Sequence, residues 1–124
     1  TGAANTVDRI IDVFPAAQQQ QVRIQLSMVL QAVISQQLVP TTDGKQTVAF
    51  EIMYTNAAIK NLIREAKTHQ IDTAIQSGAA EGMRTMDQSL LQLYQQGRIT
   101  KETALTYSIH YEAMEKRLAA LSML

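Results

Sequence analysis

Apolar residues recur at helical spacing in two stretches near the start of the chain. The first stretch contains Val7, Ile10, Ile11 and Phe14, and the second contains Val22, Leu26, Val29, Leu30 and Val33. Apolar positions three or four residues apart line one face of an α-helix. Asn5 can cap the first helix, and Pro15 ends it because proline has no N–H to donate. We therefore expect a second helix from about Ala16.

The pattern changes to alternation from about Val33, and this stretch ends at Pro40. After the turn signal Asp43-Gly44, alternation is strict, with apolar residues at Val48, Phe50, Ile52 and Tyr54. A period of two predicts β-strands, and two strands joined by such a turn predict a β-hairpin that places Glu51 on its polar side. Because an isolated hairpin is marginal in water, its apolar face should lie against helices or extend a sheet supplied by another part of a longer protein.

Beyond Asn56, a plausible N-cap, the pattern is helical again. A helix from there to about Thr68 would have two distinct faces. Its apolar face would contain Ile59, Leu62, Ile63 and Ala66, and its basic side would contain Lys60, Arg64 and Lys67. One face can pack on a core while the other is free to meet a charged partner. On the pattern alone, a solvated surface is the simpler interpretation of the three cations.

Four more helices are expected, over residues 72–81, over residues 85–96, from Thr100 and from about Tyr111. Thr100 can cap the helix that it precedes. Thr85 with Gln88 matches a capping box, and Gly97 is a typical residue just past a helix end. The predicted fold class is therefore mainly α with a small β-hairpin.

No catalytic or metal-binding constellation is found within the chain. Gly44-Lys45 is not a P-loop, because Val39 stands where the first glycine would be and Gln46 follows the lysine. His69 and His110 have no second His or Cys at ligand spacing. His69 is expected to interact with the last carbonyl groups of its helix. The chain alone is thus predicted to have no catalytic residue, no metal site and no cofactor.

Composition narrows the function classes further. The chain has 124 residues, 46% hydrophobic, which suits one globular domain or a large piece of one. Eleven basic and eleven acidic residues give no net charge, so nucleic acid is a poor candidate partner. There is no cysteine, and no apolar run approaches the roughly 18 residues of a transmembrane segment. We expect a cytoplasmic protein, and a start on Thr1 fits a fragment or a processed chain.

The stretch AIKNLIRE resembles the signature of a known family. It consists of Ala58, Ile59, Lys60, Asn61, Leu62, Ile63, Arg64 and Glu65. The stretch is similar to the AIRNLIRE motif of the PilT family, the type IV pilus retraction ATPases of the bacterial type II/IV secretion ATPase superfamily, with Lys60 where the family usually has Arg. Three other segments are similar to PilT sequences in the same order, namely TVDRIIDVFP (6–15), LQAVISQQL (30–38) and KTHQI (67–71).

The resemblance implies that the chain is the C-terminal portion of a RecA-like P-loop ATPase. Thr1 and Gly2 look like the residues that follow the histidine of the family's His box, so the phosphate-binding and metal-binding motifs would precede them. Residues 1–55 would form the C-terminal edge of the ATPase core, and residues 56–124 a helical subdomain that carries the motif. ATP and Mg would be cofactors of the parent protein, and this chain alone would be inactive.

The resemblance also implies a motor function. The parent would be a cytoplasmic hexamer, peripheral to the inner-membrane pilus machinery, that uses ATP hydrolysis to retract pili in twitching motility. Its motif matches residues that family members need for retraction. Lys60, Arg64 and Lys67 are therefore candidate contacts with a neighbouring subunit or with the inner-membrane pilus platform protein.

Two other functions remain open on the sequence. A pilus-assembly or type II secretion ATPase of the same superfamily is the nearest competitor, although such proteins rarely carry the sequence from Lys60 to Glu65. From another class, the chain could be an autonomous helical protein-interaction module with no link to ATP. A P-loop encoded upstream of Thr1 would distinguish a motor from a module.

Overall fold

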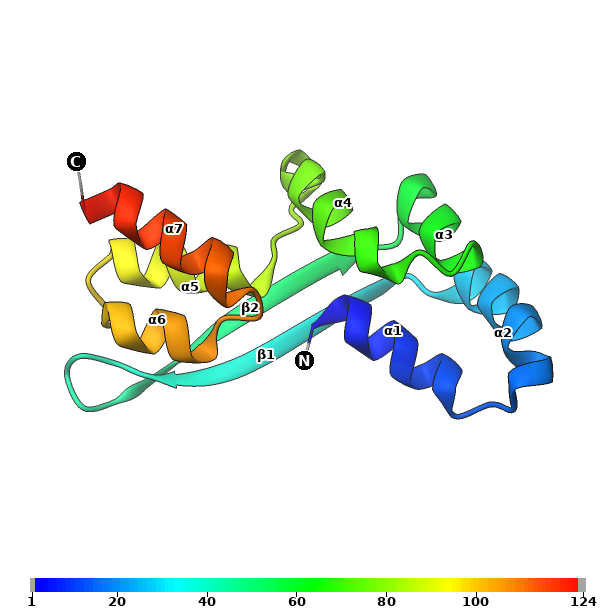
Figure 1. Ribbon diagram of the computed structural model, residues 1–124, viewed down its shortest axis with the longest axis horizontal. Helices are drawn as coiled ribbons and strands as arrows, with labels where there is room; N and C mark the ends of the chain where they lie inside the picture. Colours follow the sequence, from blue (N-terminus) through cyan, green and yellow to red (C-terminus); the bar gives the residue numbers. More distant parts are fainter. Residues whose placement is uncertain (1, 123–124) are drawn as a thin grey trace. The chain divides into compact units, whose positions relative to one another are not determined.

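The computed structural model describes residues 2–122 (Figure 1). In chain order the elements are α1 (Ala3–Asp12), α2 (Ala16–Val29), β1 (Ala32–Pro40), β2 (Gln46–Tyr54), α3 (Ala57–Arg64), η1 (Thr68–Gln70), α4 (Ile71–Ser77), η2 (Ala79–Glu81), α5 (Met86–Gln95), α6 (Lys101–Tyr107) and α7 (Tyr111–Ser122). The two strands pair with each other in a hairpin. The predicted class, mainly α with a small β-hairpin, is confirmed.

The described part of the chain divides into two compact units. Unit 1 comprises residues 2–35 and Glu51–Thr85, and unit 2 comprises Gln36–Phe50 and residues 86–122. In unit 1, α2 and α3 lie side by side and α1 packs against α2 (Figure 1). In unit 2, α6 packs against both α5 and α7. The predicted division after residue 55 concerns the parent protein and stays a prediction.

Each unit has its own apolar core. The core of unit 1 is built from Ala3, Val7, Ile11, Met53, Ile59, Ile63, Ile71, Ile75 and Met83. The core of unit 2 is built from Val39, Ala49, Met86, Leu90, Leu93, Ile99, Ala104, Met114 and Leu118. Both strands therefore contribute core residues, which explains why a two-stranded hairpin persists here.

Several helix ends follow the local sequence signals. The side chain of Asn56 accepts a hydrogen bond from the Ile59 N–H at 3.0 Å, and that of Thr100 accepts from the Thr103 N–H at 3.1 Å. Gly97 adopts a positive φ of 74° just beyond α5. These three ends need only residues close in sequence, and all three predictions are confirmed.

The start of α1 differs from the prediction. The helix begins at Ala3, preceded by a fully extended Gly2, and is not capped by Asn5. The Ala3 N–H donates to the Glu51 carboxylate, a group 48 residues away. The first N–H groups of a helix have no partner within the helix, and here a side chain distant in sequence accepts from one of them. Residues near Ala3 in the sequence do not indicate this contact.

The inner face of β2 is also the opposite of the expected one. Ala49, Glu51 and Met53 are buried, with exposures of 0, 1 and 0%, while Tyr54 on the other face is 43% exposed. Glu51 was expected on the polar side, but the structure buries it. Because successive residues of a strand point to opposite faces, packing that buries one residue also buries the other residues on its face. This holds even when the residues on the opposite face are more apolar.

Helix α3 is shorter than the helical spacing of its apolar residues predicted. It ends at Arg64, not near Thr68. His69 consequently lies within the 3-10 turn η1 and not at the end of an α-helix, so the expected contact with terminal carbonyl groups of that helix is wrong. The expected helix over residues 72–81 is likewise two pieces, α4 and η2.

Candidate docking surface on helix α3

Helix α3 is fixed in unit 1 by its cap and its apolar side. Asn56 holds the first turn, as described above, and Ile59 and Ile63 have no exposed surface. Leu62 is half-buried and packs against the same core. A helix of 8 residues would be marginal alone, so this packing holds it in place. The expected packing face is thus present except for Ala66, which lies beyond the helix.

The opposite side of α3 presents two exposed cations, Lys60 and Arg64. They are four residues apart and share a face, as the sequence predicted. The Arg64 guanidinium donates a hydrogen bond to the Asn61 side chain, a neutral group. Neither α3 nor the adjoining α2 contains an acidic residue. These cations therefore lie on a surface whose own two helices supply no carboxylate.

Lys67 does not join this face in the structure. It follows the end of the helix, and its ammonium lies 3.7 Å from the carboxylate of Glu65. Both side chains are more than half exposed, so the pair contributes little to stability, about 0–1 kcal/mol. The predicted row of three cations is reduced to Lys60 and Arg64.

The end of α3 is closed by a Schellman motif. The Lys67 N–H donates to the Leu62 carbonyl at 2.8 Å, and the Ala66 N–H donates to the Ile63 carbonyl at 3.3 Å. Ala66 between them has φ of 60°, in the left-handed region. It is the one described residue other than glycine with positive φ. Glycine is usual at this position because a Cβ makes the left-handed conformation unfavourable.

Two side chains from other helices hold this closed end. The Thr68 hydroxyl, on a residue 8% exposed, donates to the Asp8 carboxylate of α1 at 2.8 Å. The Gln20 amide of α2 donates a longer bond, 3.4 Å, to the Arg64 carbonyl. The sequence pattern indicated none of Asp8, Gln20 or Thr68 as part of the site. Their polar contacts span 60 and 44 residues, so nothing local indicates them.

Of the remaining predicted residues, Ala58 and Asn61 are exposed on α3 and Glu65 is its C-cap. Gly2 is buried at the start of α1. Thr1 lies outside the described residues.

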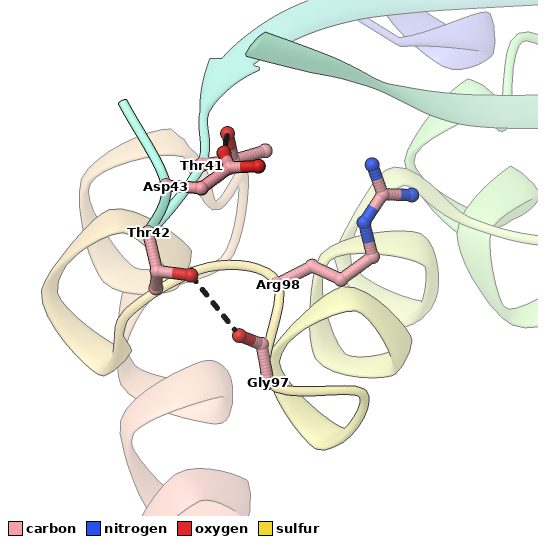
Figure 2. Close-up of a pocket in the computed structure, with 5 residues that line it drawn as sticks. All are labelled: Thr41, Thr42, Asp43, Gly97 and Arg98. Atoms are coloured by element: carbon pink, nitrogen blue, oxygen red, sulfur yellow. Dashed lines mark hydrogen bonds between the residues drawn. The ribbon is translucent and has the colours of Figure 1, made fainter. Parts of the chain in front are cut away.

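Unit 2 contains a small polar depression of about 130 Å³, lined by Thr41, Thr42, Asp43, Gly97 and Arg98 (Figure 2). The Thr42 hydroxyl donates to the Gly97 carbonyl at 3.3 Å. A hydrogen bond from the Thr41 hydroxyl is the main cause that lowers the pKa of Asp43, with smaller help from the Lys45 N–H and the Arg98 charge. These contacts stabilise the hairpin turn.

Within residues 2–122 no group of three or more His, Cys, Asp or Glu side chains is placed to hold a metal ion. None of the helices in this part of the chain is long and apolar enough to cross a bilayer.

Known proteins are similar to this chain in sequence and in fold. No protein-family model matches the chain. A twitching motility protein of Neisseria gonorrhoeae is 53% identical over 115 residues, 92% of this chain and 31% of that protein. The type IV pilus retraction ATPase PilT of Pseudomonas aeruginosa is 48% identical over 104 residues, 84% of this chain and 30% of that protein.

A solved structure agrees with these relatives. The crystal structure of the pilus retraction motor PilT with bound ADP superposes with a TM-score of 0.81 at 44% identity, covering 92% of this chain and 32% of the other. The chain thus spans about three-tenths of the length of the proteins it matches. The resemblance inferred from the sequence is confirmed: over most of its length this chain is homologous to the C-terminal part of the pilus retraction ATPase PilT.

Proposed function

We propose that the chain is the C-terminal region of a hexameric, cytoplasmic motor ATPase that uses ATP hydrolysis to retract type IV pili. The observation that carries this proposal is 53% identity to a twitching motility protein over 92% of the chain. Within that region, α3 has the geometry of a docking helix. Its buried side is anchored by Ile59 and Ile63, and its open side presents Lys60 and Arg64.

The proposal assigns residues 1–55 to the C-terminal edge of a RecA-like core and residues 56–124 to a helical subdomain. ATP and Mg would be held by the parts of the parent that precede this region. The 124-residue chain itself should hydrolyse no ATP, since it lacks a phosphate-binding loop. Magnesium-dependent ATP turnover above background by the purified chain would contradict this assignment.

In this proposal, Lys60 and Arg64 contact acidic groups on a neighbouring subunit or on the inner-membrane pilus platform. An arginine held by a neighbouring amide loses little freedom on binding, which favours such a contact. Charge pairs across an interface mainly set orientation and partner choice. Loss of these charge pairs should therefore uncouple ATP hydrolysis from pilus retraction while the nucleotide site stays intact.

A double variant in the full-length protein tests this role. Lys60→Ala with Arg64→Ala should abolish twitching, while ATP hydrolysis by the purified protein stays within about twofold of the parent. The matched control is Lys116→Ala with Arg117→Ala, which removes two exposed cations from α7. Normal twitching by the Lys60, Arg64 double variant would leave this face a solvated surface. A full-length protein without ATPase activity would refute the motor itself.

A further inference from the structure

The residues at the end of α3 are compatible with two conformations, a longer helix and the closed end that is observed. Alanine at position 66 has the highest intrinsic helix propensity. It also continues the apolar face of Ile59, Leu62 and Ile63 at helical spacing. A helix that ran on to Thr68 would bring Lys60, Arg64 and Lys67 into one row. Local preference therefore favours a longer α3 than the one observed.

The structure adopts the other conformation. The chain leaves the helix through a left-handed Ala66, and Lys67 turns to Glu65. Two other turns of the chain have the same pair of closing hydrogen bonds, and each uses glycine, Gly82 and Gly97, at the left-handed position. For alanine, this conformation is disfavoured by a factor of about 5–30 in population. Something beyond local preference must stabilise it.

Contacts with α1 and α2 supply that stabilisation. Thr68 is almost fully buried where its hydroxyl meets the Asp8 carboxylate, and Gln20 donates to the last helical carbonyl, that of Arg64. A helix that continued past Arg64 would carry Thr68 away from Asp8, because a left-handed residue redirects the chain. The Asp8–Thr68 hydrogen bond is therefore made only in the closed conformation.

We propose that the end of α3 is a two-state latch. In the closed state, seen here, Asp8 and Thr68 hold Ala66 left-handed and Lys67 pairs with Glu65. In the open state, α3 extends to Thr68 and Lys60, Arg64 and Lys67 form one cationic row that docks on an acidic protein surface. Protein carboxylates fit better than nucleic acid because the chain has no net charge to gather phosphates. The latch deepens the proposed function by regulating the same surface.

The conformational step can be tested without ATP or pili. In the 124-residue chain, Asp8→Ala should move the ¹³Cα shifts of residues 65–68 toward helical values, whereas Ala66→Gly should move them away. Glycine lowers the helical population about fivefold relative to alanine and accepts positive φ freely. Asp12→Ala is the matched control, since it removes an exposed carboxylate from the same helix. Thr68→Val should behave like Asp8→Ala, and Thr68→Ser, which keeps the hydroxyl, like the parent.

The docking step uses a hexaglutamate peptide as the probe. Asp8→Ala should bind it at least threefold more tightly than the parent chain, and Ala66→Gly at least threefold more weakly. Unchanged shifts at residues 65–68 in Asp8→Ala would overturn the latch. Equal peptide affinity in all variants, or tighter binding of a single-stranded oligonucleotide than of hexaglutamate, would overturn the acidic-protein assignment. Neither result depends on motor activity, so failure of the latch is distinguishable from failure of the proposed function.

Discussion

The C-terminal ends of α3 and α5 close in the same way with different residues. At α5 the Arg98 N–H bonds to the Leu93 carbonyl at 3.0 Å and the Gly97 N–H to the Tyr94 carbonyl at 2.9 Å. At α3 the equivalent bonds are 2.8 and 3.3 Å, and the left-handed residue is Ala66. Glycine encodes the first end locally. The second end depends on Asp8, Thr68 and Gln20, which teaches that one hydrogen-bond pattern can be specified by sequence or by packing.

The largest expected effect comes from substitutions on the buried apolar side that each of the two helices has. Ile63 in α3 and Leu90 in α5 are each fully buried. Ile63→Ala and Leu90→Ala should each lower the free energy of unfolding by about 2–5 kcal/mol, from lost burial and the cavity left behind. Urea denaturation measures this, with the exposed Lys60→Ala as control, for which a change under about 0.5 kcal/mol is expected. A loss below 1 kcal/mol at Ile63 would mean that α3 is not held by its apolar side.

Substitution of Gly97 should break the locally encoded end. A Cβ added there meets no atom within 4 Å, so the effect comes from the backbone conformation alone. Gly97→Ala should therefore destabilise the chain by about 1–2 kcal/mol, the usual penalty for a left-handed alanine. Thermal melting tests this, with Gln96→Ala as the neighbouring control. An unchanged melting temperature would show that unit 2 tolerates alanine here as unit 1 does at position 66.

The reverse substitution at α3 should have the opposite sign. Ala66→Gly relieves the left-handed alanine but increases the freedom of the unfolded chain, for a net gain of about 0.5–1 kcal/mol. Ala58→Gly is the contrasting control, because inside the helix glycine should lose about 0.5–1 kcal/mol. The free energy of unfolding from urea titration distinguishes the two signs. Destabilisation by Ala66→Gly would mean that the left-handed conformation carries no strain.

The smallest effect is a pH dependence beside the end of α5. The hairpin turn contacts the residues that follow α5, because the Thr42 N–H donates a hydrogen bond to the Arg98 carbonyl at 3.0 Å. The Thr41 hydroxyl lowers the pKa of Asp43 below its ordinary value of 3.8. The ionised carboxylate thus stabilises the turn above that value, and the contribution is lost as pH falls through the lowered pKa. The effect should be small because Asp43 is fully exposed.

An NMR titration of the Asp43 side chain checks this prediction. Its midpoint should lie below 3.8 in the parent chain and move up toward that value in Thr41→Val, which removes the donated hydrogen bond. Equal midpoints in the two proteins would assign the shift to another cause. Thr41→Ser, which keeps the hydroxyl, should titrate like the parent.

The sequence by itself determined the features that depend on neighbouring residues. Asn56 and Thr100 cap the helices that follow them, Gly97 ends α5, and alternation defines β2. These signals work locally because a cap or a left-handed glycine satisfies backbone groups within one turn. The residues of the motif at 58–65, with the three other similar segments, also indicated the relatives, because similarity of sequence can be compared without knowledge of the packing.

Tertiary structure alone decided the rest. The N-terminal end of α1 is completed by Glu51, which the alternating pattern assigned to the polar side of β2. The end of α3 lies at Arg64 because Asp8 and Thr68 offset the helix propensity of Ala66. Each of these outcomes depends on a hydrogen bond between residues about 50 or more positions apart. Such partners meet only after the chain has folded, so propensity and periodicity along the sequence could not reveal them.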